Sequence, residues 1–243
     1  MLVGLKRLII GTPLEAPARR LMALTSSAAR KNERDDDALR ALIHTLPPDA
    51  NCVDIGANVA HILTAMVESC PQGRHIAFEP VPRLAADLRR RFPQVDVRAK
   101  AVTAAPGRIA FTVVPSRPTR SGISATLDLS VDAAVEEIEV EATTLDAELP
   151  VGHRPTLIKC DVEGAELEVL LGARRVLREH RPILAFEHQY GGHPTPERTA
   201  RIHDELTALD YRVQTIHGAA LDRARFADVV AAGAEWNFLA LPR

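Results

Sequence analysis

Two apolar runs that each lead to an acid constrain the fold of this chain more than any other feature. The first, Cys52 to Ile55, contains Asp54 and leads into the turn Gly56-Ala57-Asn58. The second, Ile76 to Phe78, ends at Glu79, which lies 25 residues after Asp54. In doubly wound α/β folds, a carboxylate about 20 residues beyond the first strand turn accepts the hydroxyls of a ribose. The two runs therefore predict two strand ends that bind one nucleoside.

The turn after the first strand distinguishes between two nucleoside cofactors. Gly56 has no Cβ, so the backbone can approach a ligand closely. A nicotinamide cofactor needs two further glycines, whereas this turn continues with Asn58 and Ala60. The carboxylate of Asp54 would repel a pyrophosphate and would suit the sulfonium and ammonium groups of S-adenosylmethionine. The charge favours a methyl donor, and a nicotinamide dehydrogenase is the less favoured alternative.

Strand and helix patterns alternate along the chain from about residue 50, which predicts an α/β fold with a mostly parallel sheet. The predicted strands are 51–55, 75–79, 95–102, 156–161, 182–187, 211–217 and 236–241, and the predicted helices are about 60–70, 82–91, 165–178 and 197–209. Two more alternating stretches, 111–114 and 138–143, predict an inserted hairpin or flap over about 108–143.

Residues 1–48 precede this pattern and are predicted to form an N-terminal helical extension. Asp35-Asp36-Asp37 would form the acidic first turn of a helix over residues 38–43 that Pro47-Pro48 ends. The extension would cover the pocket or pair two subunits, and a homodimer is favoured because an amphipathic helix must bury its apolar face. The apolar start, Met1 to Ile10, is far shorter than the roughly 20 residues that span a bilayer, so we expect no integral membrane segment.

The composition is that of a globular enzyme with one large domain. The chain has 243 residues, of which 46% are hydrophobic and 26% charged. A net charge of -2 and an aromatic content of 4% argue against a nucleic-acid partner, which would need a basic surface or stacking platforms. Cys52, Cys70 and Cys160 are odd in number and lie in apolar runs, which indicates reduced thiols and a cytoplasmic location.

Several motifs in order make the chain similar to a known family, the FkbM-type S-adenosylmethionine-dependent methyltransferases. The matching segments are Val53-Asp54-Ile55-Gly56-Ala57-Asn58, Phe78-Glu79-Pro80, Thr144-Leu145-Asp146, the run from Leu157 to Glu166, and Asn237-Phe238-Leu239-Ala240. The chain departs from the family pattern at Ala60 and His61, where the family has glycine and an aromatic residue, and at Cys160, which replaces an aliphatic residue.

The resemblance implies a Rossmann-like class I methyltransferase domain over residues 49–243, with a seven-stranded, mostly parallel sheet, helices on both faces and an antiparallel last strand. It also implies O-methylation of a hydroxyl on a sugar, an oligosaccharide or a glycosylated or polyketide-type metabolite. The alternative from another class is a non-catalytic protein that binds S-adenosylmethionine or a nucleoside without turnover.

Ligands of such sheets bind outside the carboxyl ends of the strands, where the strand order reverses. Five predicted strand ends carry candidate residues for this rim, namely Asp54, Glu79, Ala101, Asp161 and Glu187. We predict that Asp54, Gly56, Asn58, Glu79, Ala101 and Asp161 bind the cofactor, with Ala101 near the adenine. Asn58 could instead cap the helix that follows it.

Asp161, Glu187 and His188 follow two neighbouring predicted strands and are the predicted catalytic residues. Two carboxylates and an imidazole could hold Mg²⁺ or Mn²⁺ together with the acceptor hydroxyl. Without a metal, His188 would be the general base and Glu187 would orient it. Neighbouring residues on a strand point to opposite sides, which weakens both versions.

The acceptor is predicted to be a small molecule or oligosaccharide, bound by the less regular parts of the chain. Polar loop side chains suit a polyhydroxylated acceptor, and the turn after the first strand adds a histidine. The predicted acceptor-binding residues are His61, Arg120, Ser124, Glu163 and Tyr190.

Overall fold

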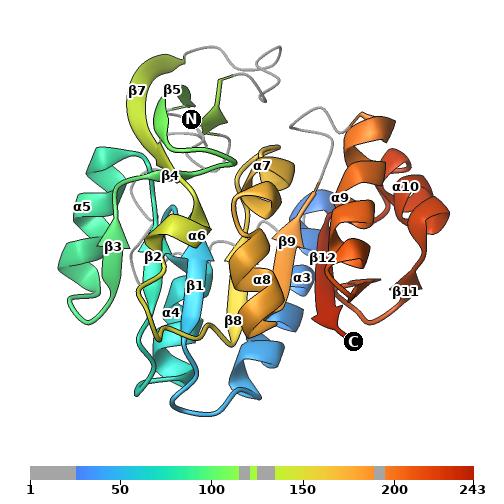
Figure 1. Cartoon of the computed structure of the whole chain (residues 1–243), viewed down its shortest axis with the longest axis horizontal. Coiled ribbons are helices and arrows are strands. Elements are labelled where there is room, and N and C mark those ends of the chain that lie inside the picture. Colours follow the sequence, from blue (N-terminus) through green and yellow to red (C-terminus); the bar gives the residue numbers. More distant parts are fainter. Residues whose placement is uncertain (1–25, 115–120, 125–134, 189–194) are drawn as a thin grey trace.

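A computed structural model describes residues 26–114, 121–124, 135–188 and 195–243, with elements numbered as in Figure 1. Its main sheet has the strand order β11-β10-β12-β9-β8-β1-β2-β3. The strands are β1 (Cys52–Ile55), β2 (Ile76–Phe78), β3 (Asp96–Arg98), β8 (Leu157–Cys160), β9 (Ile183–Glu187), β10 (Tyr211–Thr215), β11 (Ala220–Leu221) and β12 (Asn237–Pro242).

The strands from β3 to β9 pair in parallel, whereas β12 runs antiparallel to both β9 and β10. This arrangement confirms the predicted Rossmann-like sheet with an antiparallel last strand. The sheet has eight strands instead of seven, because the chain turns back after β10 at Gly218 and adds the short β11.

Helices cover both faces of the sheet (Figure 1). They are α3 (Ser27–His44), α4 (His61–Ser69), α5 (Pro82–Arg91), α6 (Leu145–Glu148), α7 (Glu166–Leu171), α8 (Arg174–His180), α9 (Pro196–Ala208) and α10 (Arg223–Ala231). Alternation along the strands separates two cores: Val53 and Ile55 belong to the cluster under α6 to α10, while Cys52 belongs to the one under α3 to α5. The three cysteines are buried and free.

The helix predicted over residues 165–178 is instead two helices, α7 and α8, that meet at Gly172. The carbonyl of Thr103 packs so closely there that a Cβ on residue 172 would lie 2.0 Å from its oxygen. Asp146 then starts α8, because its carboxylate accepts the backbone N–H groups of Arg175 and Val176, each at 2.9 Å. The Thr144-Leu145-Asp146 motif therefore has a structural role.

A second, smaller sheet with the order β4-β7-β5-β6 stands above the carboxyl ends of the main strands (Figure 1). Its strands are β4 (Ala101–Val102), β5 (Gly107–Val113), β6 (Gly122–Ile123) and β7 (Glu136–Thr143). The strand predicted over 95–102 is therefore wrong as one element, since β3 and β4 belong to different sheets. β5 and β7 pair antiparallel in the region where a hairpin was predicted.

Helix α3 is longer than predicted and begins at Ser27 instead of near residue 38. Ser26 caps it by accepting a hydrogen bond from Ala29 N at 3.3 Å. Asp35 therefore lies within the helix, buried, with Lys31 Nζ at 3.2 Å and His217 Nε2 at 2.9 Å. Local charge could not place the helix start, because the acids serve as ion-pair partners and not as a first turn.

Residues 1–25, and with them the apolar start of the chain, lie outside the described residues, and the homodimer stays a prediction. Among the residues that the structure describes, no helix is both long enough and apolar enough to cross a membrane.

Candidate active site

A pocket of about 600 Å³ lies at the carboxyl ends of β1, β2, β8 and β9, between the main sheet and the small sheet. This volume is within the range of about 300–1,000 Å³ that small-molecule sites occupy. Residues of helix α3 and strand β12 also line it. The predicted strand-end residues Asp54, Glu79, Ala101, Asp161 and Glu187 all line it.

The turn after β1 is held by backbone contacts that only glycine permits. Gly56 has φ +79, and a Cβ there would lie 1.9 Å from the carbonyl oxygen of Asp161. The N–H groups of Gly56 and Ala57 both donate to Phe78 O, at 3.0 and 3.1 Å. The turn is thus packed against the end of β8 and joined to the end of β2.

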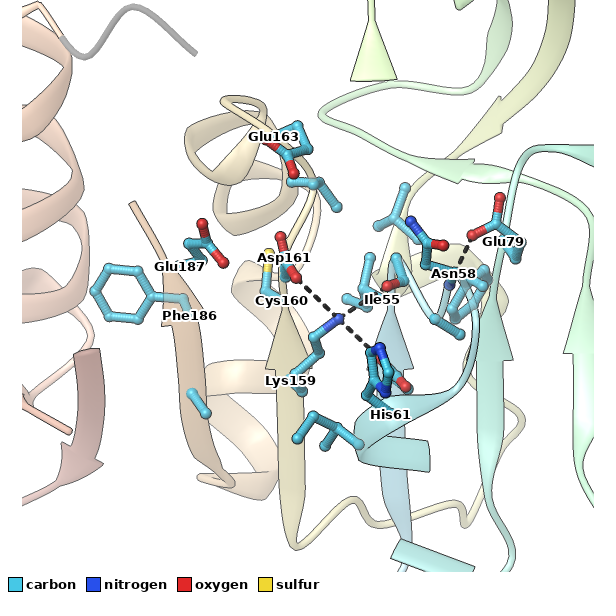
Figure 2. Close-up of a pocket in the computed structure, with 18 of the residues that line it drawn as sticks. Ile55, Asn58, His61, Glu79, Lys159, Cys160, Asp161, Glu163, Phe186 and Glu187 are labelled. Carbon is cyan, nitrogen blue, oxygen red and sulfur yellow. Dashed lines mark hydrogen bonds and ion pairs between the residues drawn. The ribbon is translucent and has the colours of Figure 1, made fainter. Parts of the chain in front are cut away.

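Asn58 and Ala60 continue this turn in the left-handed region, with φ +47 and +73. Ala60 is the residue before α4, and within the described part of the chain no side chain forms a cap hydrogen bond with that helix. Asn58 therefore does not act as its N-cap. Its backbone N–H donates to the carboxylate of Glu79 instead, at 2.8 Å (Figure 2).

Glu79 is a buried carboxyl group that faces the pocket from the end of β2. One oxygen accepts from Asn58 N, and the other accepts from Val81 N at 2.9 Å. Burial raises the pKa of Glu79 to about 7. A carboxylate has about four lone-pair sites, so two remain for the hydroxyls of a ribose.

Lys159 also lines the pocket, although sequence reasoning gave it no role in the site. Its side chain rises from β8 into the pocket floor, where the ammonium donates to Gly56 O at 2.8 Å (Figure 2). It also forms ion pairs with Asp54 at 3.2 Å and Asp161 at 3.4 Å. Its signal in the sequence was a lone lysine in the apolar run of β8, two residues before an acid and so on the same side of the strand.

Asp161 and Glu187 end two neighbouring strands and face the same pocket (Figure 2). Burial, together with the negative charges of Asp161 and Glu163, holds the pKa of Glu187 well above its usual range. Glu163 also lines the pocket, from a backbone with φ +53. The pocket wall therefore combines an acid that pairs with Lys159 and a second carboxyl whose pKa is raised.

His188 lies away from this pocket, which corrects its assignment as a catalytic residue or metal ligand. Its Nε2 lies 3.0 Å from Thr199 Oγ1 and its Nδ1 lies 3.5 Å from Glu166 Oε2. The ring stacks on Phe226 in the core under α9 and α10. Since neighbouring residues on a strand alternate, Glu187 faces the pocket and His188 does not.

The predicted Mg²⁺ or Mn²⁺ site of Asp161, Glu187 and His188 is therefore not formed. Within the described ranges, no cluster of three His, Cys, Asp or Glu side chains is arranged to hold a metal ion.

The predicted acceptor residues divide into three groups. His61 and Glu163 line the pocket. Ser124 does not, because its hydroxyl lies 2.8 Å from that of Thr112 in the small sheet. Arg120 and Tyr190 lie outside the described residues. Ser121 and Ile123, from the loop segment expected to bind the acceptor, also line the pocket. Sequence reasoning missed lining residues from α3, β5 and β12, namely Asn32, Asp36, Phe111 and Asn237.

Comparison with known proteins agrees with this geometry. The model of the FkbM methyltransferase domain matches residues 54–213. AMB antimetabolite synthetase AmbE of Pseudomonas aeruginosa is 28% identical over 243 residues, which cover 80% of this chain and 11% of that protein. Methyltransferase 1 of Beauveria bassiana is 29% identical over 147 residues, which cover 52% of this chain and 59% of that protein.

Among solved structures, methyltransferase FkbM from Methylobacillus flagellatus KT shares the fold, with a TM-score of 0.50 at 20% identity. The match covers 81% of this chain and 45% of that one, so the chain spans only part of each of these relatives. Because the family model matches more than half of the sequence, this chain belongs to the FkbM methyltransferase family.

Proposed function

We propose that this chain transfers the methyl group of S-adenosylmethionine to a hydroxyl oxygen of a small polyhydroxylated acceptor, such as a sugar, an oligosaccharide or a polyketide-type metabolite. Methyl transfer follows from membership of the family, whereas the oxygen acceptor is our proposal. The observation that carries it is Glu187, a carboxyl with a strongly raised pKa in the pocket wall beside the donor site.

The pocket residues fit the donor. Glu79 has lone pairs to spare for the ribose hydroxyls, and the small sheet offers apolar contacts through Ala101 and Phe111. The side chain of Asp161 is 34% exposed, so it can meet the cationic end of the cofactor. When bound, S-adenosylmethionine supplies a methyl group already activated by the sulfonium.

An alcohol needs positioning and a base before it can accept a methyl group. The acceptor oxygen must be held at about 3–3.5 Å from the methyl carbon, in line with the breaking bond. Its proton is lost only with difficulty at neutral pH, so a carboxylate whose pKa is raised toward neutrality is a suited base. The pKa of Glu187 is held well above its usual range, which makes this carboxyl the candidate base, whereas Asp161 is engaged by the ammonium of Lys159 at 3.4 Å.

The lining also supports an acceptor that carries no phosphate. Among the residues that the structure describes, six acidic side chains and two lysines line the pocket, so a further anion would be repelled. Amide and hydroxyl groups at the edge can pair with the hydroxyls of a sugar-like molecule. They come from Asn32, Ser121 and Asn237.

The test combines S-adenosylmethionine labelled with ¹³C in its methyl group with a panel of mono- and oligosaccharides and polyketide alcohols. Carbon NMR of the products distinguishes methyl on oxygen from methyl on nitrogen, sulfur or carbon. We expect O-methyl products, and we expect Glu187→Gln to lower kcat by about 10²–10⁴-fold with little change in cofactor affinity.

The matched control is Glu168→Gln. Glu168 on α7 pairs with Arg198 on α9 outside the pocket, so this variant should not affect turnover. Methyl transfer to an atom other than oxygen, or an active Glu187→Gln variant, would contradict the proposal. Cofactor binding without transfer to any hydroxyl compound would favour the non-catalytic binding protein.

A further inference from the structure

We infer that Lys159 is a positioning residue that acts as the internal counter-ion of the methyl-donor site, holding the glycine turn, Asp54 and Asp161 in one arrangement. The inference rests on the donor site proposed above, and it assigns a role to a residue that does not itself contact the substrate.

The ammonium of Lys159 is already surrounded by groups of the protein itself. It donates a hydrogen bond to Gly56 O at 2.8 Å and forms ion pairs with Asp54 Oδ1 at 3.2 Å and Asp161 Oδ2 at 3.4 Å. The two carboxylates also raise its pKa, so it is neither a base nor a nucleophile. Its effect must pass through the groups that it holds.

The two acids that pair with Lys159 differ in the exposure of their side chains. The side chain of Asp54 is 1% exposed and that of Asp161 is 34% exposed. Among the described residues no hydrogen bond reaches Asp54 Oδ1, so the ammonium of Lys159 offsets the burial of that oxygen. Asp54 is thus the inner partner of the lysine, and Asp161 is the acid presented to the ligand.

Lys159 also sets the net charge at the floor of the donor site. Two carboxylates and one ammonium leave the floor of the site with one net negative charge, which suits a cationic methyl donor. Burial raises the pKa of the Asp54 carboxyl, and Lys159 opposes that rise. Loss of the lysine alone would therefore leave Asp54 as a buried carboxylate without its counter-ion or as a protonated acid, and either state disturbs the floor of the site. Removal of Asp54 together with the lysine would leave Asp161 alone and restore the net charge.

A double-mutant cycle tests this inference. The variants are Lys159→Met, Asp54→Asn and the double variant, with S-adenosylmethionine and S-adenosylhomocysteine affinities measured by calorimetry and melting temperatures by circular dichroism. We expect Lys159→Met to weaken donor binding by at least about tenfold, and the double variant to recover most of that loss. A lysine that served only as apolar packing would not be rescued by removal of a carboxylate.

Two controls accompany the cycle. Lys159→Arg keeps the charge and should bind the donor within about fivefold of the wild type. Lys31→Met removes another lysine between two carboxylates, Asp35 at 3.2 Å and Glu235 at 2.5 Å, that does not line the pocket. It should lower the melting temperature and leave donor affinity unchanged.

The outcomes separate this inference from the proposed function. If the wild type binds the donor and the double variant binds no better than Lys159→Met, the counter-ion role alone is overturned. If Lys159→Met does not fold, a double variant that folds and shows a cooperative melting transition supports the role. A double variant that also fails to fold overturns it. A wild type that binds neither cofactor form overturns the donor site and this role together.

Discussion

Alanine substitutions at three glycines separate two destabilising effects that act together at the turn after β1. These effects are backbone strain and steric overlap of the added Cβ. Gly218 has φ +93, and no atom of the described ranges lies within 4 Å of an added Cβ, so only backbone strain of about 1–2 kcal/mol is expected there. Gly172 has φ -84, so strain is absent, but its Cβ would lie 2.0 Å from Thr103 O. Gly56 combines φ +79 with a Cβ 1.9 Å from Asp161 O.

The contact at Gly56 fixes the expected magnitude. To accept a Cβ, the ends of β1 and β8 must separate by about 1 Å, and overpacking of this kind costs about 1–3 kcal/mol. We therefore expect Gly172→Ala to lower the free energy of unfolding by about 1–3 kcal/mol, and Gly56→Ala by the sum of both costs, about 2–5 kcal/mol. Urea unfolding followed by circular dichroism measures all three variants.

The same series reports on the site. Only Gly56→Ala moves Asp161 relative to the turn, so it alone should weaken S-adenosylmethionine binding in calorimetry, while Gly172→Ala and Gly218→Ala keep the affinity of the wild type. The reasoning fails if Gly56→Ala costs no more stability than Gly218→Ala, or if a stable Gly56→Ala variant binds the cofactor normally.

Two further predictions concern buried acids. Asp35→Asn should lower the free energy of unfolding by about 1–3 kcal/mol in urea, because it removes the buried carboxylate that pairs with Lys31 and His217 and leaves Lys31 with Glu235. Asp37→Asn, at an exposed position of the same helix, should change it by under about 0.5 kcal/mol, and equal effects would refute the reasoning. Burial raises the pKa of Glu79 to about 7, so its stabilising effect is fully present below its usual pKa and is lost as the pH rises through 7. The cofactor-free wild type should therefore lose about 3 kcal/mol between pH 4.5 and 8 relative to Glu79→Gln, and parallel pH profiles would contradict this.

The strand ends and the cofactor turn could be predicted because their signals are local. An apolar run that stops at Asp54 or Glu79, followed by Gly56, marks a strand end and a tight turn wherever the chain goes next. Side-chain alternation along a strand is equally local, but it predicts only that two neighbouring residues point to opposite sides of the sheet. It could separate Glu187 from His188, and it could not say which of the two faces the pocket.

The other features of the fold and the site could not be predicted, because they depend on contacts between segments that are far apart in the sequence. The partners of Lys159 come from the turn after β1, and the division between α7 and α8 comes from the carbonyl of Thr103. Asp35 appeared to start a helix because its partners, including His217, lie far along the chain. The pocket wall from α3 was missed for the same reason, since Asn32 and Asp36 reach the site only after the helix packs beside β12.

The central claim is that one pocket at the strand ends binds S-adenosylmethionine and presents its methyl group to an oxygen acceptor beside Glu187. A crystal structure with S-adenosylhomocysteine and a methyl-accepting saccharide tests it most directly. We predict ribose hydroxyls bonded to Glu79, the amino-acid end beside Asp161, and an acceptor hydroxyl between the sulfur and Glu187. A nucleoside bound away from Glu79, or an acceptor that does not reach Glu187, would contradict the account.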